Sequence, residues 1–284
     1  MNAIEMKNVN KALGDFAIQN LDFVLPEGCI CGLVGENGAG KSTTIRLIMG
    51  ALRADSGEIG VLGTDVNSSE FIGTKQDIGV VLDDAFFPEV LNASQIRRIM
   101  RNTYVNWNDA LFDSYIRDFS LPVSKPIKDY SRGMRMKLAI AAALCHDAKL
   151  LVLDEATAGL DPIVRDEVLD MLNEFTRRED HSILISSHII SDLEKLCDYI
   201  AFIHEGKLKF CEEKDVLIEK YGIFAGTNAQ FRTIDSDAVI YSESNGLGGV
   251  RAMVLRDRIP EGIQLEKCSV EDVILNTVKG EKKR

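Results

Sequence analysis

Hydrophobic residues run together or recur at helical spacing along most of this chain, and the two patterns alternate. Short continuous apolar runs predict buried strands; the clearest lie at residues 29–34, 78–82, 150–153 and 182–186. Apolar residues three and four positions apart predict helices, at residues 42–49, 162–177 and 189–197. Alternation of strands and helices is typical of an α/β fold, in which helices cover a sheet.

Two regions depart from this alternation. Near the start, residues 3–9 and 21–25 predict short strands separated by turns. Between residues 84 and 145 the pattern becomes helical, with candidate helices at residues 93–101, 109–119 and 133–145. We therefore expect a helical subdomain at about residues 84–145, inserted into the α/β core.

The periodic pattern weakens towards the end of the chain. Residues 199–210 predict a hairpin that turns at Glu205-Gly206, and residues 269–278 predict a terminal helix. Between them the pattern matches no element that we can name. We expect a main domain at residues 1–211 and a C-terminal extension of uncertain role at residues 212–284.

Composition and charge narrow the class of protein. The 284 residues carry 33 basic and 44 acidic side chains, a net charge of −11, which argues against a general nucleic-acid-binding surface. The longest apolar runs are too short to cross a bilayer, and the first residues lack the features of a signal peptide. We expect a cytosolic protein. Cys29-x-Cys31 is compatible with a metal site or with two buried thiols, and its apolar setting favours thiols.

The most informative motif is a glycine-rich loop at residues 35–43, which fits the phosphate-binding pattern G-x-x-x-x-G-K-[ST] between a strand and a helix. Glycines let backbone N–H groups turn towards phosphate oxygens, and the helix start adds a positive dipole end. We expect Lys41 to reach the β- and γ-phosphates and the Ser42 hydroxyl to coordinate Mg²⁺. The residues expected to hold the nucleotide here are Gly35, Asn37, Gly38, Gly40, Lys41, Ser42 and Thr43.

Two acids, Asp154 and Glu155, follow the apolar run at residues 150–153. A carboxylate at that strand tip is expected beside the phosphate loop, so Asp154 is a candidate ligand of Mg²⁺. Glu155 lies one residue further and is placed to act as a general base on an attacking water. Acids in this position can also cap the next secondary-structure element, but the phosphate loop in the same chain favours metal-binding and catalytic roles.

A third motif, Tyr-Ser-Arg-Gly-Met-Arg at residues 130–135, precedes a predicted helix. Taken alone, a serine there indicates an N-cap or part of a second anion site. With it, the chain resembles the ATP-binding subunits of ABC-type transporters, whose hallmark is a Ser-Gly-Gly-Gln-like signature at a helix start. Ser131 and Gly133 match that signature, whereas Arg132 and Met134 depart from it. The resemblance covers about residues 2–211.

Two further segments look like the same family. Residues 158–161 resemble its D-loop and end in Asp161, which joins Ser131 and Gly133 among the expected nucleotide-binding residues. His188 stands where the family has its switch histidine, after the last core strand. Its resemblance to that residue implies a catalytic role beside Glu155, with a hydrogen bond towards the γ-phosphate.

The resemblance implies a fold and an activity. The fold is α/β: a P-loop NTPase core with an antiparallel β subdomain, the inserted helical subdomain and a small C-terminal extension. The activity is that of an ATPase whose cofactors are ATP and Mg²⁺. Two chains, as a homodimer or as a heterodimer with a similar ATPase subunit, would sandwich each ATP between the loop of one chain and the signature of the other.

The family couples this cycle to transport. We expect a separate integral membrane permease as partner, no nucleic acid, and a peripheral location on the inner face of the cell membrane. A short subunit that carries the motif at residues 130–135 looks most like bacterial export-type subunits, such as those of antibiotic or lantibiotic exporters. Residues 84–100, with the apolar segment 86–88, are expected to contact the permease; core packing is the alternative.

Several positions depart from the family pattern. Leu13 stands where an aromatic ring usually stacks on adenine. Phe16 could replace that ring only if the loop bends, because its spacing differs. We therefore expect weak discrimination of adenine, or an adenine contact from another part of the protein. Arg132 either adds charge near the partner chain's phosphates or faces the permease. Asp83 replaces a common glutamine; because a carboxylate is a harder Mg²⁺ ligand than an amide, we expect it at the metal, unless it caps a turn.

Two other classes of protein also use a phosphate loop. A soluble ABC-type ATPase acting on nucleic acid or ribosomes usually carries two nucleotide domains or a coiled-coil arm, which this sequence lacks. A phosphate-loop kinase lacks the Ser131 and Gly133 signature and the Asp161 loop. The sequence therefore favours a transporter subunit, and it does not identify the transported substrate.

Overall fold

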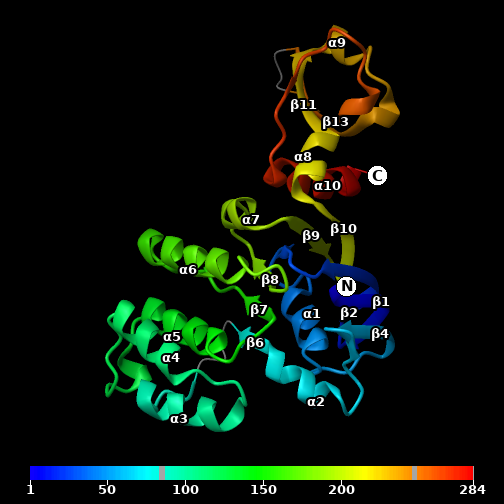
Figure 1. The fold of residues 1–284 in the computed structure, drawn as a ribbon. Helices are drawn as coiled ribbons and strands as arrows, with labels where there is room; N and C mark the ends of the chain where they lie inside the picture. The colour runs from blue at the N-terminus through cyan, green and yellow to red at the C-terminus, as the bar shows by residue number, and fades with distance from the viewer. Residues whose placement is uncertain (83–86, 245–247, 284) are drawn as a thin grey trace. The chain divides into compact units, whose positions relative to one another are not determined.

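The computed structural model describes residues 1–82, 87–244 and 248–283, so that Asp83 and Phe86 lie outside the described residues. The chain divides into two compact units, residues 1–211 and residues 212–284 (Figure 1). In the described ranges no helix is long and apolar enough to span a membrane. All six cysteines lie within the described residues, none of them forms a disulfide bond, and Cys31 is fully buried.

A six-stranded sheet forms the centre of the first unit, in the order β10-β9-β3-β8-β7-β6. Its strands are β3 (Ile30–Val34), β6 (Ile78–Val81), β7 (Leu150–Asp154), β8 (Ser182–Ser187), β9 (Tyr199–His204) and β10 (Lys207–Glu213). Strands β6, β7, β8, β3 and β9 run parallel. Their carboxyl ends therefore share one edge, where ligands bind in sheets of this kind.

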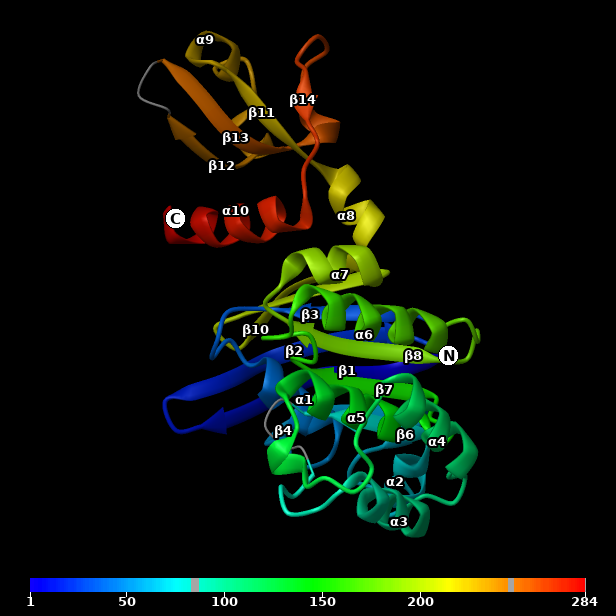
Figure 2. The same cartoon turned by 90° about the vertical axis from the view of Figure 1, so that its left-hand side faces the viewer.

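Helices cover this sheet on both faces. Helix α1 (Lys41–Ile48) packs between the six-stranded sheet and a second sheet, and contacts β4 and β7. Helices α6 (Pro162–Phe175) and α7 (Ile190–Leu196) lie on the opposite face (Figure 2). The strands and helices expected around the phosphate loop are thus confirmed, with boundaries within about two residues.

The second sheet of this unit is antiparallel, in the order β2-β1-β4-β5. Its strands are β1 (Asn2–Leu13), β2 (Phe16–Pro26), β4 (Ser56–Val61) and β5 (Thr64–Asp65). Its inner face and helix α1 share one apolar core, which includes Ile4, Leu25 and Ile45. This confirms the antiparallel β subdomain of the expected fold.

The helical subdomain has a core of its own. Helices α3 (Ala93–Thr103), α4 (Asp109–Asp118) and α5 (Arg132–Leu144) enclose buried side chains such as Phe112 and Leu138. Phe87 packs against this core, which agrees with core packing for that part of the 86–88 segment. Shorter elements of the unit are α2 (Phe71–Thr74), η1 (Lys75–Asp77) and η2 (Ile127–Asp129).

The second unit is a small α+β fold. Its antiparallel sheet has the order β12-β13-β11-β14, with β11 (Tyr221–Thr227), β12 (Val239–Ser244), β13 (Gly249–Leu255) and β14 (Leu265–Glu266). Its helices are α8 (Lys214–Lys220), α9 (Asn228–Phe231), η3 (Ser236–Ala238), η4 (Arg256–Arg258) and α10 (Val270–Lys283). Phe224 and Val254 lie in its core. The terminal helix was expected, whereas the sheet was not.

Candidate functional site

The phosphate loop connects the end of β3 to the start of α1. Gly38 and Gly40 have φ values of 82° and 118°, which residues with a side chain rarely adopt. A Cβ on Gly40 would also lie 2.7 Å from Ile18 Cδ1 and 3.0 Å from Phe16 Cζ. The N–H of Gly206, in the β9–β10 turn, donates to the carbonyl of Ala39 and ties the loop to the sheet.

Lys41 is the buried cation of this loop. Its Nζ donates to the carbonyl of Gly35 at 2.8 Å and lies 3.2 Å from Oε1 of Glu155. The other carboxylate oxygen of Glu155, Oε2, lies 2.7 Å from Nδ1 of His188. An ionised carboxylate only accepts hydrogen bonds, so Nδ1 of His188 carries the proton in this contact. Three residues from distant parts of the sequence thus meet at one carboxylate.

The backbone of Glu155 is strained, with a positive φ of 53°. Such values are uncommon for residues other than glycine and cluster at functional sites. The N–H of Glu155 donates to both the carbonyl and the Oγ of Ser186, each at 3.1 Å, and these bonds hold the conformation. The result is a carboxylate turned towards the phosphate loop, directly after the buried Asp154.

A pocket of about 610 Å³ opens above these groups. Of the predicted site residues, those that line it are Asn37, Gly38, Gly40, Lys41, Ser42, Thr43, Glu155 and His188. Those among the described residues that do not are Gly35, Ser131, Gly133, Asp154 and Asp161. The pocket is also lined by Phe16, Arg132 and Gly159, which sequence reasoning did not assign to it.

Phe16 reaches the pocket because the β1–β2 hairpin is tight. Leu13 pairs with Phe16 across the turn Gly14-Asp15, and Gly14 has a φ of 59°. This turn brings Phe16 onto the phosphate loop, while Leu13 stays exposed. Phe16 therefore lines the pocket despite its spacing from the usual aromatic position, because the Gly-Asp turn bends the chain there; that turn is the signal in the sequence that indicates it.

Oxygen donors suited to Mg²⁺ flank the pocket. Ser42 lines it, and the Oδ1 atom of Asp154 accepts a hydrogen bond of 2.5 Å from Ser186 Oγ, which fixes that carboxylate at the end of β7. Within the described residues no group of three or more acids, histidines or cysteines could hold a metal ion by itself. This set fits Mg²⁺, which proteins usually hold with one or two carboxylates, the phosphates of the substrate and water.

The signature and D-loop residues act structurally as helix caps. Ser131 Oγ accepts from the N–H of Met134 at 3.2 Å and begins α5. Asp161 Oδ1 accepts from the N–H of Val164 at 3.1 Å and begins α6. A Cβ on Gly133 would lie 3.2 Å from Val164 Cγ1, so the two helix starts are close neighbours.

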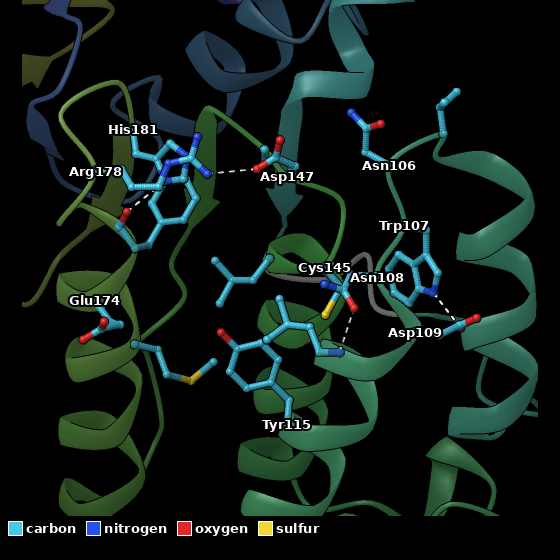
Figure 3. Close-up of a pocket in the computed structure, with 16 residues that line it drawn as sticks. Asn106, Trp107, Asn108, Asp109, Tyr115, Cys145, Asp147, Glu174, Arg178 and His181 are labelled. Carbon is cyan, nitrogen blue, oxygen red and sulfur yellow. Dashed lines mark hydrogen bonds and ion pairs between the residues drawn. The ribbon is translucent and has the colours of Figure 1, made fainter.

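A larger cavity of about 790 Å³ lies between the helical subdomain and α6 (Figure 3). Charged groups there are already paired: Arg178 with Asp147 at 3.0 Å, and Asp109 with Trp107 Nε1 at 3.0 Å. Burial lowers the pKa of His181, whose Nδ1 lies 2.9 Å from the carbonyl of Phe175. No residue of the phosphate loop lines this cavity, so the smaller pocket is the candidate nucleotide site.

Comparison with known proteins agrees with the geometry. The family model described as ABC transporter matches residues 18–158. The uncharacterized ABC transporter ATP-binding protein YhcH of Bacillus subtilis is 31% identical over 271 residues, which are 92% of this chain and 87% of that protein. The lantibiotic transport ATP-binding protein SrtF of Streptococcus pyogenes is 32% identical over 75% of this chain and 91% of that protein.

A solved structure shows the same fold. The ATP binding subunit of an ABC transporter matches with a TM-score of 0.69 and 26% identity, covering 76% of this chain and 91% of that chain.

Proposed function

The chain belongs to the ATP-binding proteins of ABC transporters, and from that premise we propose that it hydrolyses ATP to power a separate membrane permease of export type. The observation that carries the proposal is the carboxylate of Glu155, which lies between Lys41 of the phosphate loop and His188 on the wall of a pocket large enough for a nucleotide.

The mechanism follows from the contacts of Glu155. In the structure Lys41 Nζ contacts Glu155 Oε1. When ATP binds, its β- and γ-phosphates compete with this carboxylate for Lys41 Nζ. The released carboxylate can accept a proton from the water that attacks the γ-phosphorus, while the bond from that phosphorus to the β–γ bridging oxygen breaks and ADP leaves. His188 holds the other carboxylate oxygen and so fixes the direction in which Glu155 points. A bound Mg²⁺, held by Ser42 and Asp154, would neutralise phosphate charge.

Adenine has a candidate partner in this pocket. Phe16 lines it beside Gly40 and presents an aromatic ring, which is the kind of surface on which a base stacks. We therefore assign adenine stacking to Phe16 and replace the expectation of weak adenine discrimination.

Two chains complete the site in this proposal. Ser131 and Gly133 do not line the pocket of their own chain, and a helix N-terminus is suited to bind phosphate. We infer that they act on ATP held by a second chain, in a homodimer or in a heterodimer with a similar subunit. The dimer would lie peripherally on the inner face of the membrane, bound to the permease.

The test is purification of the tagged chain from native membranes in mild detergent. We expect a hydrophobic permease to accompany it and ATP hydrolysis by the assembly to depend on Mg²⁺. Lys41→Ala should abolish turnover and keep the permease bound, because the contacts that Lys41 makes, with the phosphate loop and Glu155, lie inside the pocket. Absence of an integral membrane protein from the purified chain, or turnover that survives Lys41→Ala, would overturn the proposal.

A further inference from the structure

The larger cavity lies at the opposite edge of the central sheet from the nucleotide pocket. Its lining includes Cys145 and Ala148, which precede β7, and Arg178 and His181, which precede β8. These residues stand at the amino ends of the two strands, whereas Glu155 follows the carboxyl end of β7. The cavity and the pocket share no lining residue. A volume of about 790 Å³ is in the range of sites for small organic ligands.

Aromatic side chains form much of the cavity wall. Trp107 and Tyr115 come from the helical subdomain, Phe175 comes from α6, and His181 follows that helix. The rings of Phe175 and His181 are stacked, with centroids 4.2 Å apart. Figure 3 shows Trp107 and His181 on opposite sides of the cavity and the hydroxyl of Tyr115 pointing into it. Walls of this kind favour a flat aromatic ligand.

The charged groups of the wall favour an uncharged ligand. Each acid that lines the cavity already has an arginine partner: Asp109 with Arg97 at 2.9 Å, Asp147 with Arg178 at 3.0 Å, and Glu174 with Arg177 at 2.7 Å. An ion that entered would lose its hydration and would meet charges that are already paired. A neutral molecule avoids this cost.

His181 contributes a polar atom without a partner. The residue is 5% exposed, and its Nδ1 lies 2.9 Å from the carbonyl oxygen of Phe175. A carbonyl oxygen only accepts hydrogen bonds, so Nδ1 carries the proton. Burial lowers the pKa of His181, which keeps the ring neutral. Nε2 is then an acceptor, and it is buried without a hydrogen-bond partner among the described residues. A ligand that supplies a donor would remove this unfavourable state.

Arg178 controls the approach to this atom. Its charge acts on the His181 ring, and the two side chains lie together beside the cavity in Figure 3. Arg178 pairs with Asp147 and with Asp180 at 3.4 Å, and all three side chains are about half exposed. Exposed ion pairs of this kind contribute little free energy. The guanidinium is therefore able to move aside at little cost when a ligand approaches Nε2.

We propose that the larger cavity is a binding site for an uncharged, flat aromatic molecule that stacks on the aromatic wall and donates an N–H or O–H hydrogen bond to Nε2 of His181. The walls come from the helical subdomain and from α6 and the segment after it, so the ligand would contact both parts of the first unit. The inference is independent of the proposed function, since the nucleotide pocket contributes no residue to this cavity.

The experiment uses the single tryptophan of the chain as a reporter. Trp107 lines the cavity, so protein labelled with fluorotryptophan gives one fluorine NMR signal, from the site itself. The full chain is titrated with benzimidazole, a neutral flat molecule with one N–H donor, and with N-methylbenzimidazole, which lacks the donor. We expect benzimidazole to shift the signal saturably, with a Kd below about 1 mM. N-methylbenzimidazole should bind about fivefold more weakly, as for one lost neutral hydrogen bond.

Two variants separate this site from other sites on the chain. His181→Phe retains a ring against Phe175 and removes the acceptor, so the two probes should bind it equally. Phe16→Ala removes the aromatic ring at the nucleotide pocket and is the control, which should change neither titration. Absence of a saturable shift in the wild type, or its loss in Phe16→Ala, would overturn the site. Equal affinities in the wild type, or a preference that survives in His181→Phe, would overturn the proposed hydrogen bond.

A third variant keeps the test decisive if His181→Phe does not fold. Arg178→Ala removes an exposed side chain and should uncover Nε2. It should strengthen the binding of benzimidazole and leave that of N-methylbenzimidazole nearly unchanged. Loss of the preference for benzimidazole in Arg178→Ala would show that the donor is not recognised by Nε2 and would contradict the inference.

Discussion

Glu155 is the residue on which the proposed chemistry depends most. We predict that Glu155→Gln lowers ATP turnover by about 10²–10⁴-fold, the usual contribution of a general base. ATP affinity should be retained, because the amide no longer competes for Lys41. Steady-state phosphate release and calorimetry measure the two quantities. Glu174→Gln, on α6 at the other cavity, is the control. Normal turnover in Glu155→Gln would show that Glu155 is not the general base and would make His188 the candidate.

We expect His146 to make the stability of the fold depend on pH. It is buried at 1% exposure, stacks on Tyr104 with ring centroids 3.8 Å apart, and lies 3.2 Å from the carbonyl of Ile78 through Nε2. Burial lowers its pKa below the usual value of 6.5. The unfolded chain therefore binds a proton first as the pH falls, so stability is present above about pH 6.5 and decreases below it.

We predict that the free energy of unfolding falls between pH 7.5 and pH 5.5, with a slope of at most about 1.4 kcal/mol per pH unit from this histidine. His146→Gln should make the fall smaller, while lowering stability at neutral pH. Urea denaturation of both proteins across this range measures the effect. Parallel curves would show that the protonation of His146 is not linked to folding.

Single residues were predictable from sequence where a motif fixed their spacing. Lys41, Ser42 and Glu155 lie in segments whose position follows from a strand and the turn after it. Phe16 and Arg132 were not assigned to the pocket, because their side chains reach it from a hairpin and from a helix start far away in sequence. Only the three-dimensional path of those elements brings them there.

At the scale of helices and strands, the boundaries that could be predicted from sequence are those that capping residues and prolines mark. Asp161 caps α6 and Pro162 is its first residue, a combination that marks a helix start. The sheet of the second unit had no comparable signal. Strand β11 contains Gly222 and Gly226, which weaken the strand pattern, and its pairing with β13 depends on residues some thirty positions away.

The start of α5 carries a prediction about assembly. Ser131→Arg should leave ATP binding by one chain intact and prevent ATP-dependent dimers and turnover, because its side chain would occupy the place of the partner's phosphates. Loss of the cap to Met134 should also destabilise the chain by about 1 kcal/mol. Ser131→Ala, which loses the cap without adding bulk, separates the two effects. If Ser131→Arg still forms ATP-dependent dimers, the role of Ser131 is only that of a helix cap.

At the scale of the whole molecule, the two phosphate-binding features that we propose for one chain lie at different places. The phosphate loop lines the pocket, whereas Ser131 and Gly133 stand outside it at the start of another helix. A second chain that presents its own signature would complete each site. ATP would then hold two chains together, and its hydrolysis would release them. In the proposed function, this association and release of the two chains drives the permease.

The mass of Glu155→Gln in solution tests this account most directly. Light scattering should show single chains without nucleotide and with ADP. With saturating ATP and Mg²⁺ it should show a mass twice as large, which persists because hydrolysis is blocked. A variant that binds ATP by calorimetry but remains a single chain at every concentration tested would contradict the account.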